Sequence, residues 1–145
     1  MENKVKKAIL FDFMRTLYDP ETGALVPFAR ELLEHARKEH DCFLISKDEG
    51  GRNEMAQALG IDIYFKEMHF VPKKTIEIFE NIVGNSYENV YVVGDRISSE
   101  IIPGNKLGYT TIWFKKGKFS TEEPKGGNEY PTHIVSSLEE VVGLL

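Results

Sequence analysis

Cysteine, long apolar runs and excess positive charge are all scarce in this sequence of 145 residues. The single cysteine, Cys42, excludes an internal disulfide, and its apolar neighbours predict a buried core thiol in a cytoplasmic protein. No apolar run is long enough to span a bilayer, and no apolar region follows the basic N-terminus, so we expect neither a membrane span nor a signal peptide. The formal net charge of -5 argues against nucleic acid as a partner.

Apolar residues make up an ordinary 41% of the chain, which suits a single domain over residues 1–145 with a proper core. Continuous apolar runs are typical of strands buried on both faces of a parallel sheet, and they occur at residues 5–13, 42–46, 89–95 and 110–114. An alternating run at residues 61–65 predicts a strand nearer an edge of the sheet, and a last short strand is expected at residues 133–135.

Helical patterns separate these runs. They cover residues 27–40, 52–59, 73–83 and 98–107, and a final helix is capped by Ser136 or Ser137. Residues 115–132 are rich in Gly and Pro and should be irregular, and therefore either functional or mobile. Strands that alternate with helices predict an α/β fold: a three-layer, doubly wound, Rossmann-like arrangement around a mainly parallel sheet.

Polar side chains end three of the predicted strands: Asp12, Ser46 and Asp95. A carboxylate at the end of a buried strand is costly unless a cation or N–H groups pair with it. For Asp12 alone, an ordinary turn aspartate explains the sequence equally well. Because parallel sheets bind ligands at the carboxyl ends of their strands, three such ends at one edge favour a site.

The strand ends resemble the signatures of the haloacid dehalogenase-like (HAD) superfamily, whose members are mostly phosphotransferases, and the resemblance covers nearly the whole chain. The family's first signature, Asp-x-Asp-x-Thr after an apolar strand, corresponds to Asp-Phe-Met-Arg-Thr at residues 12–16. The second, a Ser or Thr at the end of the next strand, corresponds to Ser46.

The third signature is a Lys at the start of a helix, which is matched by Lys73 or Lys74. We favour Lys73, because it directly follows Pro72. The fourth signature is Gly-Asp and then an acidic residue, which is matched by residues 94–95 and Glu100. The resemblance therefore implies the HAD-like core fold.

The resemblance also implies a Mg²⁺-dependent phosphohydrolase or phosphotransferase. Asp12 would attack phosphorus and form an aspartyl-phosphate. Asp12, Asp95 and the backbone carbonyl of Met14 would hold Mg²⁺, which Glu100 would support through water or by orienting its neighbours. Ser46 would bind a phosphoryl oxygen, and the signature lysine would neutralise the charge that builds up during transfer.

Met14 departs from the family pattern, because phosphatases of this superfamily carry their second aspartate at this position. That residue protonates the leaving group and activates water, and such assistance is typically worth about 10²–10⁴-fold. Asp19 and Asp48 are the nearest substitutes in sequence, but exposed loop acids are the favoured interpretation of both. Two hypotheses remain: a phosphohydrolase with a weakened acid–base step, and a catalytically weak or inactive module of the same fold that binds or regulates.

Arg15 also departs from the family, in which a Gly is frequent at this position; it either binds an anionic group of the substrate or lies in solvent. The intervals from Asp12 to Ser46 and from Ser46 to Lys73 leave no room for a cap domain. A capless site is open to large phosphorylated substrates, including macromolecules, unless a partner or a second copy of the chain closes it. It also argues against dehalogenation, which needs water excluded.

Overall fold

Six strands form one parallel sheet in a computed structural model, which describes residues 7–145. Their order across the sheet is β5-β4-β1-β6-β7-β8, and every pairing is parallel. The strands are β1 (Lys7–Phe11), β4 (His40–Lys47), β5 (Glu67–Val71), β6 (Asn89–Gly94), β7 (Thr110–Phe114) and β8 (His133–Val135). The short strands β2 (Tyr18–Asp19) and β3 (Ala24–Leu25) form a separate hairpin.

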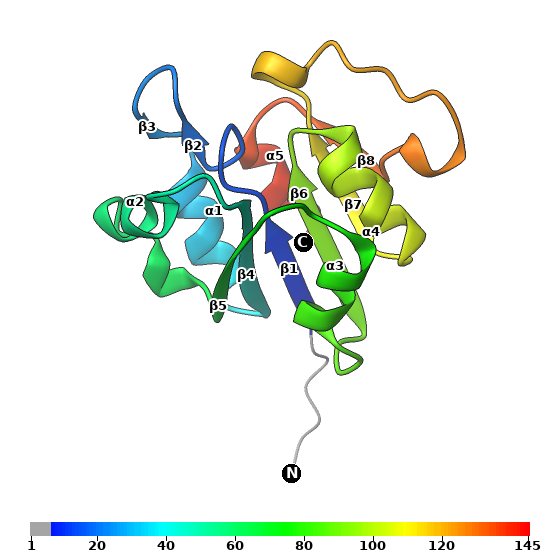
Figure 1. Cartoon of the computed structure of the whole chain (residues 1–145), viewed down its shortest axis with the longest axis horizontal. Coiled ribbons are helices and arrows are strands. Elements are labelled where there is room, and N and C mark those ends of the chain that lie inside the picture. The colour runs from blue at the N-terminus through cyan, green and yellow to red at the C-terminus, as the bar shows by residue number, and fades with distance from the viewer. Residues whose placement is uncertain (1–6) are drawn as a thin grey trace.

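Helices cover both faces of the sheet and make three layers (Figure 1). Ile9 and Phe11 of β1 pack on the layer that contains α1, α2 and α5, whereas Ala8 and Leu10 pack on the layer that contains α3. Successive side chains of a strand point to opposite faces, and all four are fully buried. The helices are α1 (Ala29–Ala36), α2 (Arg52–Ala58), α3 (Ile76–Val83), α4 (Ile102–Lys106) and α5 (Leu138–Val142). The predicted doubly wound α/β fold is confirmed.

The strand predicted at residues 61–65 is wrong. Asp62–Tyr64 forms a turn of 3-10 helix, and the edge strand is β5, which follows it and pairs with β4. Ile61 and Tyr64 are buried while Ile63 is 66% exposed, so the apolar side chains follow the three-residue spacing of a 3-10 turn. The apparent alternation depended on Ile63, an apolar side chain that the 3-10 turn leaves in solvent.

Three predicted helices also differ in their details. The helix expected at residues 27–40 is shorter, Ala29–Ala36, and His40 already belongs to β4. The helix expected from residue 73 begins only at Ile76, after Thr75, whose hydroxyl accepts a hydrogen bond from the Ile78 N–H group at the helix start. Both signature lysines therefore lie in the loop that precedes α3. The helix expected at residues 98–107 is a π-helical turn, Ile97–Ile101, followed by α4.

Residues 115–132 are irregular, as predicted, apart from two 3-10 turns at Gly117–Phe119 and Gly127–Glu129. Several hydrogen bonds attach this segment to the core. The Asn105 side chain donates to the carbonyls of Asn128 and Tyr130, at 2.7 and 2.8 Å, and the Ile97 N–H group donates to the Glu122 carboxylate at 3.0 Å. The segment is therefore attached at two places: Glu122 bonds beside the π-helical turn that follows β6, and residues 128 and 130 bond near the C-terminal end of α4, just before β7 begins.

Cys42 is buried in the core, as predicted. Burial, together with the neighbouring Asp41 carboxylate, raises the pKa of its thiol to about 12, so it stays protonated and unreactive. Across residues 7–145, none of the helices combines the length and the apolar character that a bilayer crossing requires.

Candidate active site

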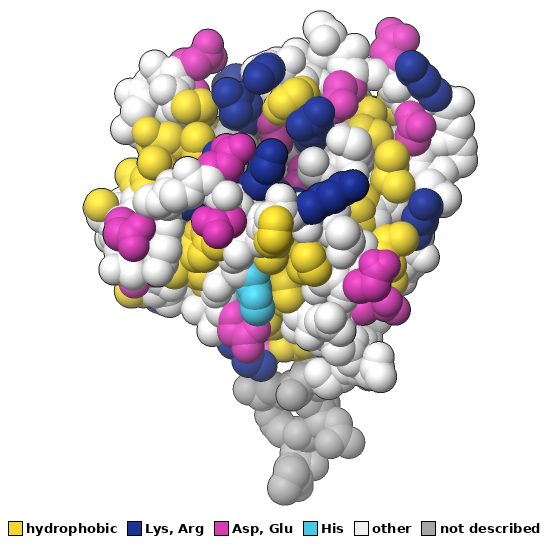
Figure 2. All heavy atoms as spheres, in the orientation of Figure 1, with side chains coloured by type: hydrophobic (Ala, Val, Ile, Leu, Met, Phe, Trp, Pro, Cys, Tyr) yellow, Lys and Arg dark blue, Asp and Glu magenta, His cyan; other side chains and the backbone are white. Residues whose placement is uncertain are grey.

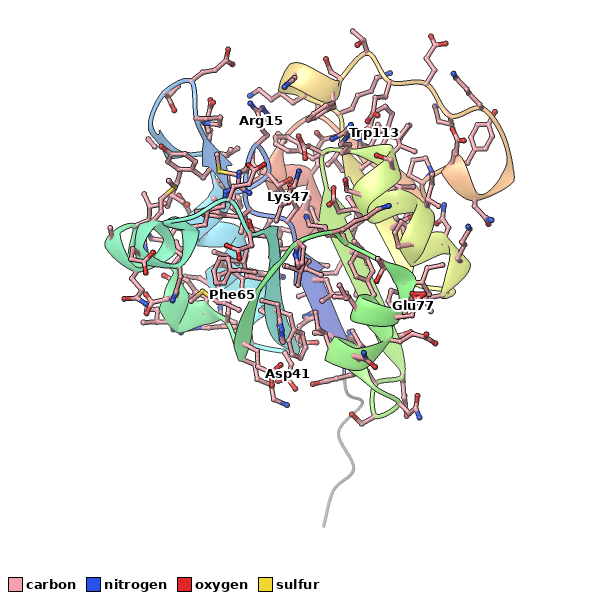
Figure 3. The ribbon with its side chains drawn as sticks, viewed as in Figure 1. Arg15, Asp41, Lys47, Phe65, Glu77 and Trp113 are labelled. Atoms are coloured by element: carbon pink, nitrogen blue, oxygen red, sulfur yellow. The ribbon has the colours of Figure 1, made fainter. Side chains whose placement is uncertain are left out.

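The carboxyl ends of neighbouring strands bring the three predicted strand-end residues to one edge of the sheet. Asp12 directly follows β1, Ser46 is the penultimate residue of β4, and Asp95 directly follows β6. Because β1 lies between β4 and β6, Asp12 takes the central position. Its N–H group donates to the Val93 carbonyl at 3.0 Å, which fixes the Asp12 backbone to the sheet. Figure 3 shows Lys47 at this end of β4 and Asp41 at the other.

Lys74, rather than the favoured Lys73, reaches the acids. Its ammonium Nζ donates to Asp12 Oδ1 at 2.6 Å and to Glu100 Oε2 at 2.7 Å, and its side chain is only 7% exposed. Lys73 is exposed and lines the mouth of the same cavity. Burial alone would lower the pKa of Lys74, but the charges of Asp12 and Glu100 outweigh that effect and raise it, so the ammonium stays charged.

Glu100 reaches the site from the π-helical turn that follows β6, by crossing directly over Gly94. A Cβ atom at residue 94 would lie 2.3 Å from Glu100 Cγ and 2.5 Å from its Oε1. Only glycine leaves room for this side chain, which explains the Gly-Asp pair before the acidic residue. Glu100 is 1% exposed and Asp95 is 3% exposed, so both carboxyl groups belong to the interior of the site.

The three acids fit a divalent cation. Asp12, Asp95 and Glu100 each offer a carboxylate oxygen, and these oxygens all lie within 4.8 Å of one another. Asp95 Oδ2 and Glu100 Oε1 are buried, and neither has a hydrogen-bond partner within residues 7–145. Unpartnered carboxylate oxygens are the ligands that Mg²⁺ prefers. Met14 lines the same cavity beside Asp12.

The charge balance of the site also fits a cation, because three carboxyl groups face the single ammonium of Lys74. Burial, reinforced by the charges of Asp12 and Glu100, raises the pKa of Asp95 to about 9. Burial likewise raises the pKa of Glu100 to about 7, although the Lys74 ammonium opposes that shift. In the absence of a bound cation, Asp95 and Glu100 therefore retain protons well above their usual range.

Thr16 fixes the orientation of the Asp12 carboxylate. Its hydroxyl donates to Asp12 Oδ2 at 3.0 Å, and the Thr16 side chain is fully buried. With Lys74 on Oδ1, both oxygens of Asp12 have defined partners. The Thr of the motif at residues 12–16 thus supports the predicted nucleophile, whereas Met14 brings no ionisable group into the cavity.

Arg52, Glu49 and Lys47 also belong to the site, although sequence reasoning passed over them. Arg52 Nη1 donates to the Ser46 hydroxyl at 3.3 Å and to the Lys47 carbonyl at 3.0 Å, and Nη2 pairs with the Glu49 carboxylate. Lys47 Nζ lies 3.5 Å from the other Glu49 oxygen. The only available sequence signal was their nearness to Ser46, since no family signature covers them.

Lys47, Glu49 and Arg52 line a cavity of about 490 Å³ over the ends of the strands, together with Lys74 and the three acids. Ser46 is fully buried and lies behind Arg52, outside this lining. Figure 2 shows basic side chains gathered around this hollow, with acidic ones deeper inside. Arg15, for which binding of a substrate anion and a place in solvent were both open, does not line this cavity. With Asp19 it borders a separate pocket of about 130 Å³ beside the hairpin, and Figure 3 shows it near that hairpin. Asp48 is exposed and is absent from the cavity wall, as expected.

Comparison with known proteins agrees with this geometry. A family model described as HAD-hydrolase-like matches residues 71–141. The HAD-hydrolase YfnB from Bacillus subtilis, in a magnesium-bound crystal structure, superposes with a TM-score of 0.68 at 21% identity, over 83% of this chain and 55% of YfnB. A haloacid dehalogenase-like hydrolase from Burkholderia xenovorans superposes with a TM-score of 0.78 at 12% identity, over 96% of each chain. The chain has the haloacid dehalogenase-like fold.

The HAD-like signatures are divided between matched and unmatched parts of the chain. The stretch that the family model covers contains Lys74, Asp95 and Glu100, whereas Asp12 and Ser46 precede it. The glyceraldehyde 3-phosphate phosphatase of Methanocaldococcus jannaschii is 30% identical over 87 residues, which are 58% of this chain. This HAD-like chain spans only 37% of the length of that phosphatase.

The HAD-like core carries no separate cap unit within residues 7–145. Between β1 and β4 lie only the β2–β3 hairpin and α1, and between β4 and β5 lie only α2 and the 3-10 turn. The cavity is therefore bordered by loops of the core and by the segment that follows β7, whose Phe119 contributes to the wall.

Proposed function

We propose that this protein is a Mg²⁺-dependent phosphohydrolase or phosphotransferase that acts through an aspartyl-phosphate on Asp12. The observation that carries the proposal is the buried cluster in which Lys74 bridges Asp12 and Glu100, with Asp95 beside them. A protein that merely kept the fold would have little reason to bury three carboxyl groups around one ammonium, because buried charges are costly. The HAD-like fold and the phosphatase among its relatives support the same reaction class.

Asp12 is the nucleophile in this reaction. One of its carboxylate oxygens forms a bond to phosphorus as the ester P–O bond breaks, and the leaving group departs as an alkoxide or aryl oxide. Thr16 and Lys74 hold the carboxylate in one orientation, so little of its freedom is lost in the transition state. Ser46 donates its hydroxyl to a phosphoryl oxygen, and Lys74 offsets the developing negative charge.

Asp12, Asp95 and Glu100 would hold the cation, and the backbone carbonyl of Met14 is proposed to complete this set. When bound, Mg²⁺ supplies charge neutralisation for the phosphoryl oxygens. The YfnB structure is described as bound to magnesium, which supports the same ion for this chain.

Met14 leaves the departing oxygen without a protein acid. A leaving group that is already stable as an anion needs no proton, so aryl phosphates should react much faster than alkyl phosphates. Hydrolysis of the aspartyl-phosphate also lacks a general base and should be slow. We propose that the substrate is phosphorylated and that the protein acts in the cytoplasm. Because the cavity is uncapped, it also leaves room for macromolecular phosphorylated substrates. Closure of the site by a second copy of the chain is also part of the proposal.

A paired assay of the purified protein with Mg²⁺ tests this function. We would measure p-nitrophenol release from p-nitrophenyl phosphate, and the transfer of labelled phosphate from acetyl phosphate to the protein, with Asp12→Asn as the control. We expect slow turnover and a trapped label, both absent in Asp12→Asn. A label without turnover would indicate a phospho-accepting module. Neither signal, with Mg²⁺ still bound, would favour a binding or regulatory role.

Restoring an acid at residue 14 tests the explanation for the slow step. Met14→Asp should accelerate turnover of alkyl phosphates by about 10²-fold or more, since general acid–base assistance is worth about that much. Met14→Asn has nearly the same shape as Met14→Asp but cannot donate an acidic proton. Equal rates for the two variants would exclude acid–base assistance as the missing component.

A further inference from the structure

The outer wall of the active-site cavity carries an excess of positive charge. Outside the buried acids, Glu49 is the single carboxylate that lines it. Four basic side chains line it there: Lys47, Arg52, Lys73 and Arg96. Lys47 is the last residue of β4 and Arg52 the first of α2, whereas Lys73 lies in the loop before α3 and Arg96 follows β6. In a chain of net charge -5, this gathering over the strand ends is a local exception (Figure 2).

The transferred phosphoryl group does not account for these outer charges. In the proposed reaction it is matched by Ser46, by Lys74 and by a divalent cation on the buried acids. We propose that the substrate is a small phosphate monoester that carries a second anionic group, a carboxylate or a further phosphate, and that Arg52 and Lys47 bind this second group. This inference rests on the proposed function, because it assigns a substrate class to the same site.

Arg52 has the geometry of an anion-binding residue. Its side chain is 13% exposed, and it lines the cavity. Three of the five N–H groups of its guanidinium have protein acceptors, namely the Ser46 hydroxyl, the Lys47 carbonyl and the Glu49 carboxylate. These bonds hold the planar group in place before a ligand arrives, which lowers the entropic cost of binding. The remaining two N–H groups suit a carboxylate or phosphate.

Although the uncapped site also leaves room for macromolecular substrates, the cavity favours a small one whose two anionic groups lie close together. Its volume of about 490 Å³ lies within the usual range for small-molecule sites. Arg52 and the proposed nucleophile Asp12 line the same cavity, and Arg52 also contacts Ser46, so an anion on Arg52 lies close to a phosphoryl group at Asp12. Phe119, from the segment after β7, closes the side away from β4, and the Arg96 guanidinium lies 4.4 Å above its ring.

Calorimetric titration with two matched esters tests this inference without relying on turnover. The probes are 3-phosphoglycerate and glycerol 3-phosphate, which share a skeleton and differ by a carboxylate in place of a hydroxymethyl group. Titrated into Asp12→Asn protein with Mg²⁺, 3-phosphoglycerate should bind with a Kd about tenfold lower, the worth of one charge-assisted hydrogen bond. Adding Arg52→Gln should bring the two Kd values within about twofold of each other, mainly by weakening 3-phosphoglycerate.

Matched variants complete the design. Lys38→Gln, an exposed charge removed near the opposite end of β4, should leave the ratio of Kd values unchanged. Lys47→Gln, which removes a side chain that is 62% exposed, should reduce the ratio about threefold and serves if Arg52→Gln fails to fold. Equal Kd values for the two esters with Arg52 intact would overturn the inference.

If Arg52→Gln lowered the affinity for both esters equally, the inference would also be overturned, since Arg52 would then only position Ser46. A failure of the proposed function looks different. A Kd ratio that favours 3-phosphoglycerate, in a wild-type protein that neither turns over p-nitrophenyl phosphate nor accepts label, would refute the catalysis and leave the second anion site standing.

Discussion

Arg15 departs from the family pattern at a position where the backbone conformation favours glycine. Its φ is 67°, in the left-handed region, and its N–H group donates to the Tyr18 carbonyl at 2.6 Å within the tight loop after β1. A residue with a Cβ atom is strained there, whereas glycine is not. A glycine, which is frequent here in the family that the chain resembles, would adopt this conformation without strain, whereas Arg15 adopts it at a cost.

Replacing Arg15 with glycine should therefore stabilise the protein. We expect Arg15→Gly to raise the free energy of unfolding in urea by about 1 kcal/mol, since the left-handed conformation costs a residue with a Cβ atom about 1–2 kcal/mol. Arg15→Ala removes the same charged side chain but keeps the Cβ atom. A similar gain in Arg15→Ala would trace the effect to the side chain and contradict the backbone explanation.

Gly94 is needed for a different reason, the passage of the Glu100 side chain. We expect Gly94→Ala to displace Glu100 from Lys74 and to lower the free energy of unfolding by about 1–3 kcal/mol, the usual cost of overpacking. Urea unfolding followed by circular dichroism measures this change. Gly126→Ala is the control, because a Cβ atom there meets nothing within 4 Å. A Gly94→Ala protein as stable as the control would show that Glu100 has another place to go.

Among the elements, the irregular segment at residues 115–132 depends on one side chain of α4. Asn105 donates to two carbonyls of the segment and accepts from the Thr111 hydroxyl at 2.7 Å. We expect Asn105→Ala to release this segment and to speed cleavage by a lysine-specific protease at Lys116, Lys118 and Lys125 about tenfold, since local opening exposes such sites. Mass spectrometry of the fragments measures the rates.

The matched control is Asn81→Ala, which changes an exposed asparagine on α3. Faster cleavage in both variants would indicate a general loss of stability. Unchanged cleavage in Asn105→Ala would mean that the contacts of Glu122 and Thr132 hold the segment by themselves.

The helices and strands also show how much of the structure could be predicted from the sequence. Buried parallel strands have long apolar runs, so β1, β4, β6 and β7 were evident, and the order of strand ends was enough to propose Asp12, Ser46 and Asp95. The edge strand β5 has half-exposed side chains and no such run, so the strand was predicted too early, at the residues of the preceding 3-10 turn.

Single-residue choices were less predictable than elements. Lys73 and Lys74 are equivalent in the sequence, and only the path of the loop before α3 decides which ammonium enters the site. Arg52 lines the cavity because the chain turns back after β4. No local sequence pattern predicts the direction of that turn. Side chains at strand ends were therefore found directly, Glu100 was found only through the resemblance to a family signature, and the loop residues Lys74 and Arg52 were left undecided or missed.

For the whole molecule, the unbalanced charge of the site links stability to both pH and Mg²⁺. A carboxyl group whose pKa is raised by folding holds its proton more tightly in the folded state, so stability falls as pH rises from its ordinary pKa toward its folded value. Without metal, Asp95 and Glu100 should therefore destabilise the fold increasingly across neutral pH, toward about pH 9 for Asp95. Burial lowers the pKa of His40, so its contribution has the opposite sign: the unfolded imidazole binds a proton more readily, and stability from His40 rises with pH around its ordinary pKa.

We expect the melting temperature in EDTA to fall by at least about 3 °C between pH 7 and pH 8.5, since a loss of about 1 kcal/mol lowers it by that amount in a chain of this size. Millimolar Mg²⁺ binds only the folded site, so it should raise the melting temperature, and more at pH 8.5 than at pH 7, because protons compete with it less. Asp95→Asn removes a proposed metal ligand and also the acid whose pKa is raised to about 9. It should therefore abolish most of the fall in melting temperature with pH and most of the rise caused by Mg²⁺. A Mg²⁺ shift that is independent of pH, or that persists fully in Asp95→Asn, would place the cation away from the three buried acids.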